Sequence, residues 1–159
     1  MSAGSGRVVV STSGAHSILT VSSDYTGPAI QNSIDALANL DVIEQDDLGI
    51  WDAETEIGTM PTGSGGRWLV SFQAGVGVGS LAGPITISAW FKVNGSYKFQ
   101  GAVVAPAGYA ADFTISGPAK VIDLADGDVI RLVGLCNDAT GATFKGGNKA
   151  LYLNMLKID

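Results

Sequence analysis

The sequence has 159 residues, of which 46% are hydrophobic and 15% are charged, and it contains 22 glycines. This length fits one domain, and the composition suits short strands joined by tight turns better than long amphipathic helices. Nine basic residues against fifteen acidic ones give a net charge of -6, which repels nucleic-acid phosphates and anionic lipids, so neither a nucleic acid nor a membrane is expected as a partner.

Cysteine content and targeting signals bear on the compartment. Cys136 is the single cysteine, so no disulfide can form within the chain, and stability must come from packing, oligomerisation or both. The opening MSAGSGRVVV has no hydrophobic run of signal-peptide length, and no stretch of about eighteen apolar residues follows. We therefore expect the protein to be made and folded in a cytosol.

Residues 1–40 are expected to form an N-terminal arm and a short helix ahead of a globular part at residues 41–159. Two stretches near the start have the composition of strands, Arg7–Ser11 and Ser17–Ser22. The first of them contains three consecutive valines, Val8, Val9 and Val10, which could pair with a neighbouring molecule.

The segment TGPAIQNSIDALANL has the pattern of a short helix. Pro28 stands where a first helical turn tolerates it, and Ile30, Ile34 and Leu37 follow at helical spacing. The acidic stretch Asp41–Glu56 that comes next is expected to be irregular.

Strand patterns begin after the loop PTGSGG. Apolar side chains alternate along RWLVSFQAGV and along ITISAWFKV, which ends at the hairpin pair Asn94-Gly95. Further strands are expected at Ala111–Ile115, Ala119–Leu124, Val129–Leu135 and Ala150–Ile158. About eight strands with no long helix between them predict an all-β antiparallel sandwich or jelly roll.

No catalytic or cofactor motif is convincing. A Ser-His-Asp triad is improbable because His16 is the single histidine and lies in the expected arm. Gly77, Gly79 and Ala82 match the spacing of a dinucleotide fingerprint, but a Gly-Pro pair and a strand pattern follow instead of the helix that would meet a pyrophosphate. We expect GVGVGSLAGP to be a loop, and we expect neither an enzyme nor a cofactor.

The acidic stretch could in principle bind a cation. Its carboxylates could serve as calcium ligands, but their spacing does not match an EF-hand loop. We prefer a solvated acidic loop and expect no metal site. The residues concerned are Asp46, Asp47, Asp52, Glu54 and Glu56.

The corner Asp126-Gly127-Asp128 allows two interpretations. Asp-Gly is favoured in tight hairpin turns, and two carboxylates this close could also act as an acid and a base. Nothing nearby in the sequence would separate their pKa values, so the turn is the preferred interpretation.

Three stretches resemble the jelly rolls of tumour necrosis factor (TNF) and the complement heads. They are VIDLADGDVIRLVGL, with its Gly127-Asp128 corner, the strand that runs from Gly66 to Phe72, and the closing ALYLNMLKI. The resemblance covers about Ile50 to Asp159. It implies a ten-stranded sandwich that assembles as a compact homotrimer and buries one sheet along the threefold axis.

The residues also suggest a subunit interface. Both faces of ALYLNMLKI are largely apolar, whereas a solvated strand keeps one face polar. Trp90 sits on the otherwise polar face of its strand, where a large aromatic side chain would be wasted in water. We expect these positions to contact another subunit, with cover by a loop of the same subunit as the alternative. The predicted interface residues are Trp90, Leu151, Tyr152, Leu153 and Met155.

Trimers of this kind recur among bacteriophage virion proteins, and a small, acidic, cysteine-poor chain with an N-terminal arm fits that setting. We expect a head decoration protein on the capsid surface, made in the host cytoplasm, whose jelly roll stabilises the capsid from outside. Its arm and helix would dock on the major capsid protein and gain order there. The predicted docking residues are Val8, Val9, Val10, Ile30 and Ile34.

The sequence leaves two other functions open. The first is the receptor-binding tip of a tail or head fibre, which would recognise host glycans through Trp51, Tyr97 or Tyr109. The number of copies per particle separates this role from decoration. The second is glycan hydrolysis, which rests on scattered carboxylates and is not expected.

Overall fold

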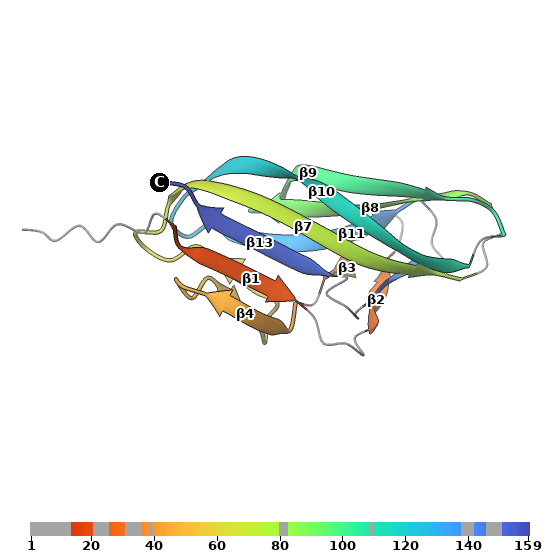
Figure 1. Ribbon diagram of the computed structural model, residues 1–159, viewed down its shortest axis with the longest axis horizontal. Helices are drawn as coiled ribbons and strands as arrows, with labels where there is room; N and C mark the ends of the chain where they lie inside the picture. The colour runs from red at the N-terminus through yellow and green to blue at the C-terminus, as the bar shows by residue number, and fades with distance from the viewer. Residues whose placement is uncertain are drawn as a thin grey trace, which may run out of the picture.

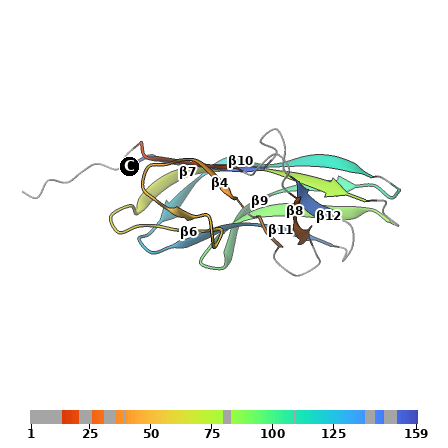
Figure 2. The same cartoon turned by 90° about the horizontal axis from the view of Figure 1, so that it is seen from below.

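The computed structural model describes residues 14–20, 26–30, 36–38, 40–79, 83–108, 110–137, 142–145 and 151–159. These residues form thirteen strands in two antiparallel sheets of seven and six strands. The sheets lie face to face as the two layers of a sandwich (Figure 1, Figure 2). The described segments contain no helix, and so none with the length and hydrophobicity needed to cross a bilayer.

The first sheet is built around one long strand. Its order is β2 (Thr26–Ile30), β12 (Ala142–Lys145), β7 (Gly66–Val78), β13 (Tyr152–Lys157), β1 (His16–Thr20) and β4 (Val42–Asp46). Strand β10 (Ala111–Leu124) also pairs with β7. Strands β12 and β13 follow one another along one edge of β7, and β10 lies along the opposite edge.

The second sheet covers the first. Its order is β5 (Trp51–Asp52), β6 (Ile57–Thr59), β11 (Val129–Cys136), β8 (Ile85–Val93) and β9 (Ser96–Ala105), and β3 (Ala36–Leu37) pairs with β11. The two sheets therefore share no strand and have separate outward faces.

The core follows from the alternation of the long strands. Strand β7 turns Trp68, Val70 and Phe72 inward, and each is at most 1% exposed. Strand β8 buries Phe91 in the same way. The Phe99 ring of β9 lies between the layers, with its centroid 5.4 Å from that of Phe72 and 5.5 Å from that of Phe91. Side chains of both sheets thus fill one hydrophobic core.

Gly101 lets β9 approach β10, a strand of the other sheet, at one side of the sandwich, and Gly117 makes room for the Phe72 ring of β7. A Cβ atom on Gly101 would lie 2.4 Å from the backbone oxygen of Ser116, and one on Gly117 would lie 2.4 Å from the Phe72 ring. The register of β10 against β7 shifts between Gly117 and Lys120. A bulge of this kind bends its strand, which brings β10 against β9 and closes this side.

The alternating segments of the sequence form strands as expected. Asn94 and Gly95 join β8 to β9 with φ angles of 49° and 78°, the left-handed conformations that a tight hairpin needs. Ala111–Ile115 and Ala119–Leu124 belong to one strand, β10, because the bulge interrupts the alternation without ending the pairing. Strand β7 continues to Val78, so the stretch predicted as a loop begins inside a strand.

The helix predicted from Pro28 is wrong for the residues that the structure describes. The segment contributes β2 and β3, which pair with β12 and β11. Pro28 lies in β2 at the edge of the first sheet, opposite the register shift between Thr143 and Lys145, where a missing N–H group is tolerated. Ile30 is 1% exposed in the core. Pairing with β12 and burial between the sheets therefore outweigh the helical spacing.

The acidic stretch is also more regular than expected. Residues 42–46 form β4 and residues 51–52 form β5, so the prediction of an irregular segment is wrong there. Strands β1 and β2 lie within residues 1–40, for which an arm is predicted, and both are paired in the first sheet. The other expected strand of the arm, Arg7–Ser11, lies outside the described residues.

The contact between β9 and β10 can be tested with a pair of glycine substitutions. We expect Gly101→Ala to lower the free energy of unfolding by about 1–3 kcal/mol, because the added methyl group meets backbone atoms. Gly79→Ala is the matched control, since nothing lies within 4 Å of the added Cβ atom, and it should change stability by less than about 0.5 kcal/mol. Urea unfolding curves measure both values, and equal effects would contradict the close contact.

Candidate functional site

A row of apolar side chains crosses the outward face of the first sheet. The strand registers place Val121 of β10 opposite Leu69 of β7, Leu69 opposite Leu156 of β13, and Leu156 opposite His16 of β1. Val121 is 49% exposed and Leu69 is 37% exposed. We call Val121, Leu69 and Leu156 the apolar row. Central strands of a solvated sheet usually present polar side chains at such positions, so the row marks a surface that favours a partner.

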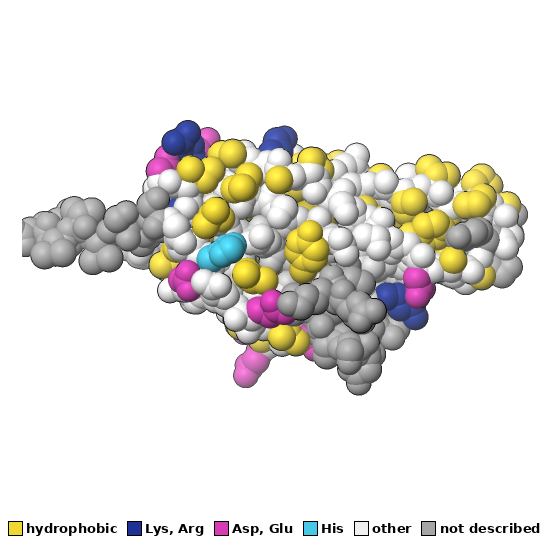
Figure 3. Space-filling model, viewed as in Figure 1, with side chains coloured by type: hydrophobic (Ala, Val, Ile, Leu, Met, Phe, Trp, Pro, Cys, Tyr) yellow, Lys and Arg dark blue, Asp and Glu magenta, His cyan; other side chains and the backbone are white. Residues whose placement is uncertain are grey.

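The positions around the apolar row are mixed in character. His16 and Asn154 are hydrogen bonded, with Nε2 of the histidine 2.7 Å from Oδ1 of the asparagine. Ile158, which follows β13, is 41% exposed. Figure 3 shows hydrophobic side chains spread over this face, with the histidine among them. The face is therefore an apolar surface with a few polar groups.

The edge strand β4 extends this surface. It pairs with β1 and ends the order of the first sheet. Val42 is 36% exposed and Ile43 is 43% exposed, although neighbouring residues of a strand point to opposite faces. Both faces of β4 thus reach solvent, so this strand is not covered by the second sheet.

The structure separates the two faces of the C-terminal strand. Leu151, Leu153 and Met155 point into the sandwich and are fully buried within one chain. Their side chains already have their contacts in a single subunit, so they are not available to a second one. Tyr152 and Leu156 face outward and are half-buried. Any interface on β13 must therefore use its outward side chains, and Tyr152 is the one predicted interface residue among them.

Trp90 lies in the other sheet. Its indole centroid is 5.0 Å from the ring centroid of Tyr97, and its Nε1–H donates to the Ser88 hydroxyl at 3.0 Å. Residues of the same chain therefore cover part of Trp90. The alternative to a subunit interface is cover by a loop of the same subunit, and here the covering residues lie in strands. Since β8 and β13 belong to different sheets, Trp90 and the outward side chains of β13 are not parts of one continuous surface.

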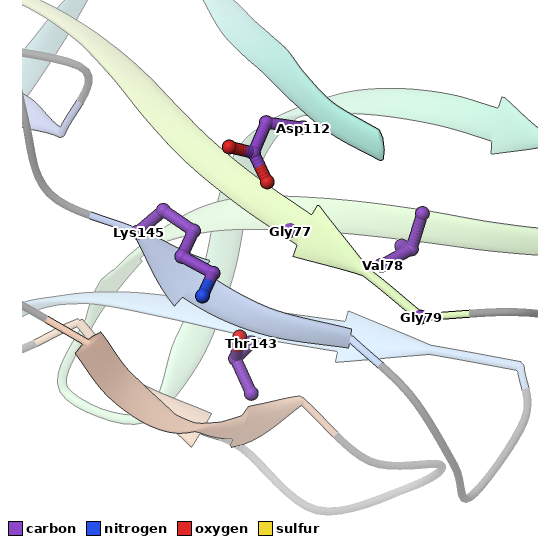
Figure 4. A pocket seen from close by; sticks show the side chains of 6 residues that line it. All are labelled: Gly77, Val78, Gly79, Asp112, Thr143 and Lys145. Atoms are coloured by element: carbon purple, nitrogen blue, oxygen red, sulfur yellow. The ribbon is translucent and has the colours of Figure 1, made fainter. Parts of the chain in front are cut away.

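A polar recess of about 260 Å³ lies at the end of β7. Figure 4 shows Asp112 of β10 and Lys145 and Thr143 of β12 around Gly77. A Cβ atom on Gly77 would lie 2.5 Å from Cε of Lys145 and 2.8 Å from Oδ1 of Asp112, so the missing side chain lets both reach over the strand. The recess offers a carboxylate, an ammonium group and a hydroxyl, which suit hydrogen bonding better than nucleophilic chemistry.

Asp126 has a structural role. Its carboxylate accepts hydrogen bonds from the backbone N–H groups of Gly63 and Gly65, both at 2.7 Å, and these bonds lower its pKa below the ordinary value of 3.8. Lys157, which is buried in β13, donates its Nζ to the carbonyl oxygens of Ser64, at 2.8 Å, and Gly65. The loop between β6 and β7 is thus held by two charged side chains, a carboxylate that binds its N–H groups and an ammonium group that binds its carbonyl oxygens.

Asp128 shapes the hairpin itself. One carboxylate oxygen accepts the backbone N–H of Ala125 at 2.8 Å, and the other accepts the amide of Asn94 at 2.7 Å. Gly127 has a φ of 82°, which a glycine adopts readily. Both carboxylates of the corner are therefore engaged in turns, as the preferred interpretation of the sequence holds.

The acidic stretch uses its carboxylates in the same way. Asp46 accepts the Ser17 hydroxyl at 2.7 Å and the backbone N–H of Trp51 at 2.8 Å. The backbone N–H of Glu54 bonds to Asp52 and lowers its pKa. In the part of the chain that the structure describes, no group of three or more histidine, cysteine or acidic side chains could hold a metal ion.

The remaining predicted site residues have varied locations. Ile30 is buried, so its side chain cannot dock on another protein as predicted. Trp51, predicted as an exposed aromatic, is 6% exposed, and its indole N–H donates to the carbonyl oxygen of Leu40 at 2.9 Å. Five further predicted residues lie outside the described residues, namely Val8, Val9, Val10, Ile34 and Tyr109.

Comparison with solved structures identifies the fold. The Eiger TNF of S. frugiperda superposes with a TM-score of 0.63 at 11% identity, over 92% of this chain and 94% of that one. The globular domain of zebrafish complement 1qA gives 0.60 at 10% identity, over 91% and 98%. Murine APRIL at pH 5.0 gives 0.55 at 15% identity, over 89% and 98%. No family model matches the sequence, and no curated protein does.

The chain therefore has the jelly-roll fold of TNF and of the complement heads. The likeness extends over nearly the whole of each chain compared, so it includes both sheets. At these identities it establishes the fold, which agrees with the resemblance seen in the sequence. A shared fold does not determine function, which depends on the surfaces of this chain.

The loop contact of Asp126 predicts an acid-sensitive contribution to stability. Folding lowers the pKa of this carboxyl group below its ordinary value of 3.8. The group therefore stabilises the folded state at pH values above 3.8, and this stabilisation is lost as the pH falls through the lower pKa of the folded state. Asp126→Asn should be less stable than the wild type at pH 7 and should lose less stability between pH 5 and pH 2. Thermal unfolding across this range measures both effects. Glu54→Gln is the control, and parallel curves for Asp126→Asn and the wild type would contradict the assignment.

Proposed function

We propose that this protein is a non-catalytic structural subunit that assembles as a homotrimer through the outward face of the first sheet. The observation that carries the proposal is the apolar row, in which Val121, Leu69 and Leu156 lie side by side on three paired strands. Association with identical copies would remove this surface from water, and the burial of apolar area is the main driving force of most protein association. A TNF-like fold suits such a trimer.

The contrast with the second sheet supports this choice of face. At the corresponding central strand β8, the outward positions carry Thr86, Ser88 and Lys92 beside Trp90. The outward positions of β7 also include the polar residues Arg67, Ser71 and Gln73. The difference is that Leu69 has apolar cross-strand neighbours on both sides, whereas Trp90 lies opposite Gln100 on one side. Self-association therefore uses the first sheet and leaves the outward face of the second sheet in solvent.

The trimer is proposed to decorate a bacteriophage capsid. The chain is small and acidic, has one cysteine, and carries a valine-rich segment ahead of β1. In this proposal Val8, Val9 and Val10 dock on the major capsid protein, while the jelly roll stabilises the particle from outside. The protein would be made in the host cytoplasm and would reside on the capsid surface. Because Ile30 is buried, the proposed docking residues are Val8, Val9, Val10 and Ile34.

The alternative function is the receptor-binding tip of a fibre. The observation that favours it is the exposure of Tyr97, which is 46% exposed beside Trp90 and away from the apolar row. Counting the copies in a particle reconstruction separates the two functions. Hundreds of copies would support decoration, and a handful would support a fibre.

The self-association face can be tested by a single substitution that introduces a charged side chain. We expect the wild type to sediment at three times its chain mass of 16.2 kDa at micromolar concentration. Leu69→Asp should give monomers, because it places a carboxylate in the centre of the buried face. Analytical ultracentrifugation measures the mass of each species.

Val104→Asp is the matched control, because Val104 is 62% exposed on the second sheet. This variant should remain trimeric. A wild-type protein that stays monomeric, or a Leu69→Asp variant that stays trimeric, would refute the proposed interface.

The docking role can be tested by deleting residues 1–13. This deletion leaves β1 whole, and β1 is needed because it pairs with both β13 and β4. We expect the shortened protein to remain trimeric but to lose its binding to capsids, because the valine segment is gone. Co-sedimentation with capsids that lack the protein measures binding. Undiminished coating by the shortened protein would show that docking does not use this segment.

A further inference from the structure

Five side chains form a patch on the outward face of the second sheet, far from the apolar row. The register places Tyr97 of β9 opposite Lys92 of β8, and Lys92 opposite Arg131 of β11. In the next row Gln100 lies opposite Trp90. We call these five residues the aromatic-cationic patch.

The aromatic part of the patch is preformed. The ring centroids of Trp90 and Tyr97 lie 5.0 Å apart at an interplanar angle of 58°, and Nζ of Lys92 lies 4.2 Å from the centroid of Tyr97. The hydrogen bond from the Trp90 indole to Ser88 fixes that ring further. The register of β8 against β9 shifts between Phe91 and Lys92, and such a bulge re-aims the side chains beside it. Tyr97 nevertheless remains 46% exposed.

The cationic part of the patch consists of Lys92 and Arg131. Lys92 of β8 lies directly opposite Arg131 of β11, and Arg131 is exposed. The guanidinium group of Arg131 matches a carboxylate in a bidentate geometry, and Lys92 adds a second positive charge on the neighbouring strand.

We infer that the aromatic-cationic patch binds an acidic saccharide. A sugar ring packs against the exposed face of Tyr97, whose position Trp90 supports, because tyrosine offers a rigid amphipathic surface. The carboxylate of the sugar pairs with Arg131 and Lys92, and the Gln100 amide reaches its hydroxyl groups. Trp90, expected from the sequence at a subunit interface, and Tyr97, expected at a glycan site, are thus parts of one site.

Charge argues for a saccharide over a nucleic acid. The chain carries a net charge of -6, which repels a polyanionic backbone at long range. A single carboxylate on a small ring needs only the local cations of the patch. This inference rests on the alternative function, in which the protein recognises host glycans. It uses no residue of the proposed trimer face.

The test uses the full-length protein and two defined probes, 3′-sialyllactose and its neutral parent lactose. Titration followed by NMR should show that the wild type binds sialyllactose at least about tenfold more tightly than lactose. Tyr97→Ala should weaken binding of sialyllactose by about tenfold or more, because the stacking surface is lost. Arg131→Gln should abolish the preference for the acidic probe.

Lys120→Gln removes an exposed cation of β10, in the other sheet, and serves as the matched charge control; its binding should equal that of the wild type. Ultracentrifugation of each variant shows whether the oligomer is intact, so a failed trimer is distinguished from a failed site. No binding of sialyllactose by the wild type, equal binding of lactose, or binding unaffected by Tyr97→Ala and Arg131→Gln would overturn the inference.

Discussion

Strand β7 carries the hydrophobic core on one face and the centre of the candidate association surface on the other. Its inward side chains from Trp68 to Val76 are at most 1% exposed, while Leu69 lies outward in the apolar row. A slip of one residue would exchange the two faces, because side chains alternate along a strand. Pairing with β10, β12 and β13 prevents such a slip. Fold and surface thus depend on the same register.

The sequence was sufficient for the strands whose alternation is strong. The apolar spacing in β7 and β8 and the Asn94-Gly95 turn are local signals, and each predicts its element without knowledge of the neighbours. The helix predicted from Pro28 is wrong because three apolar residues at helical spacing are a weak signal. Pairing of β2 with β12, more than a hundred residues later in the chain, decides its conformation. Such long-range pairing leaves no local trace.

The candidate surfaces could be predicted only in part. The sequence shows that both faces of β13 are largely apolar, but which face points outward depends on its register with β7. The sequence therefore predicts the buried Leu153 and Met155 at the interface beside Tyr152. The sequence also shows that Trp90 is an unusual residue at its position. It does not show that Trp90 contacts Tyr97, because this contact depends on the register shift between β8 and β9. Sequence patterns indicate that a side chain is unusual at its position, whereas the pairing register of the strands determines which residues it contacts.

The two sides of the sandwich differ in how they resist uncontrolled polymerisation. The approach of β9 and β10 at Gly101 closes one side, whereas β4 ends the order of the first sheet with both faces in solvent. An open sheet edge can template the addition of strands from other molecules, and shortness and charge are the usual protections. Strand β4 has five residues, and Glu44 stands at its centre. The colloidal behaviour of concentrated solutions will therefore depend on how well this short, charged stretch resists pairing with strands of other molecules.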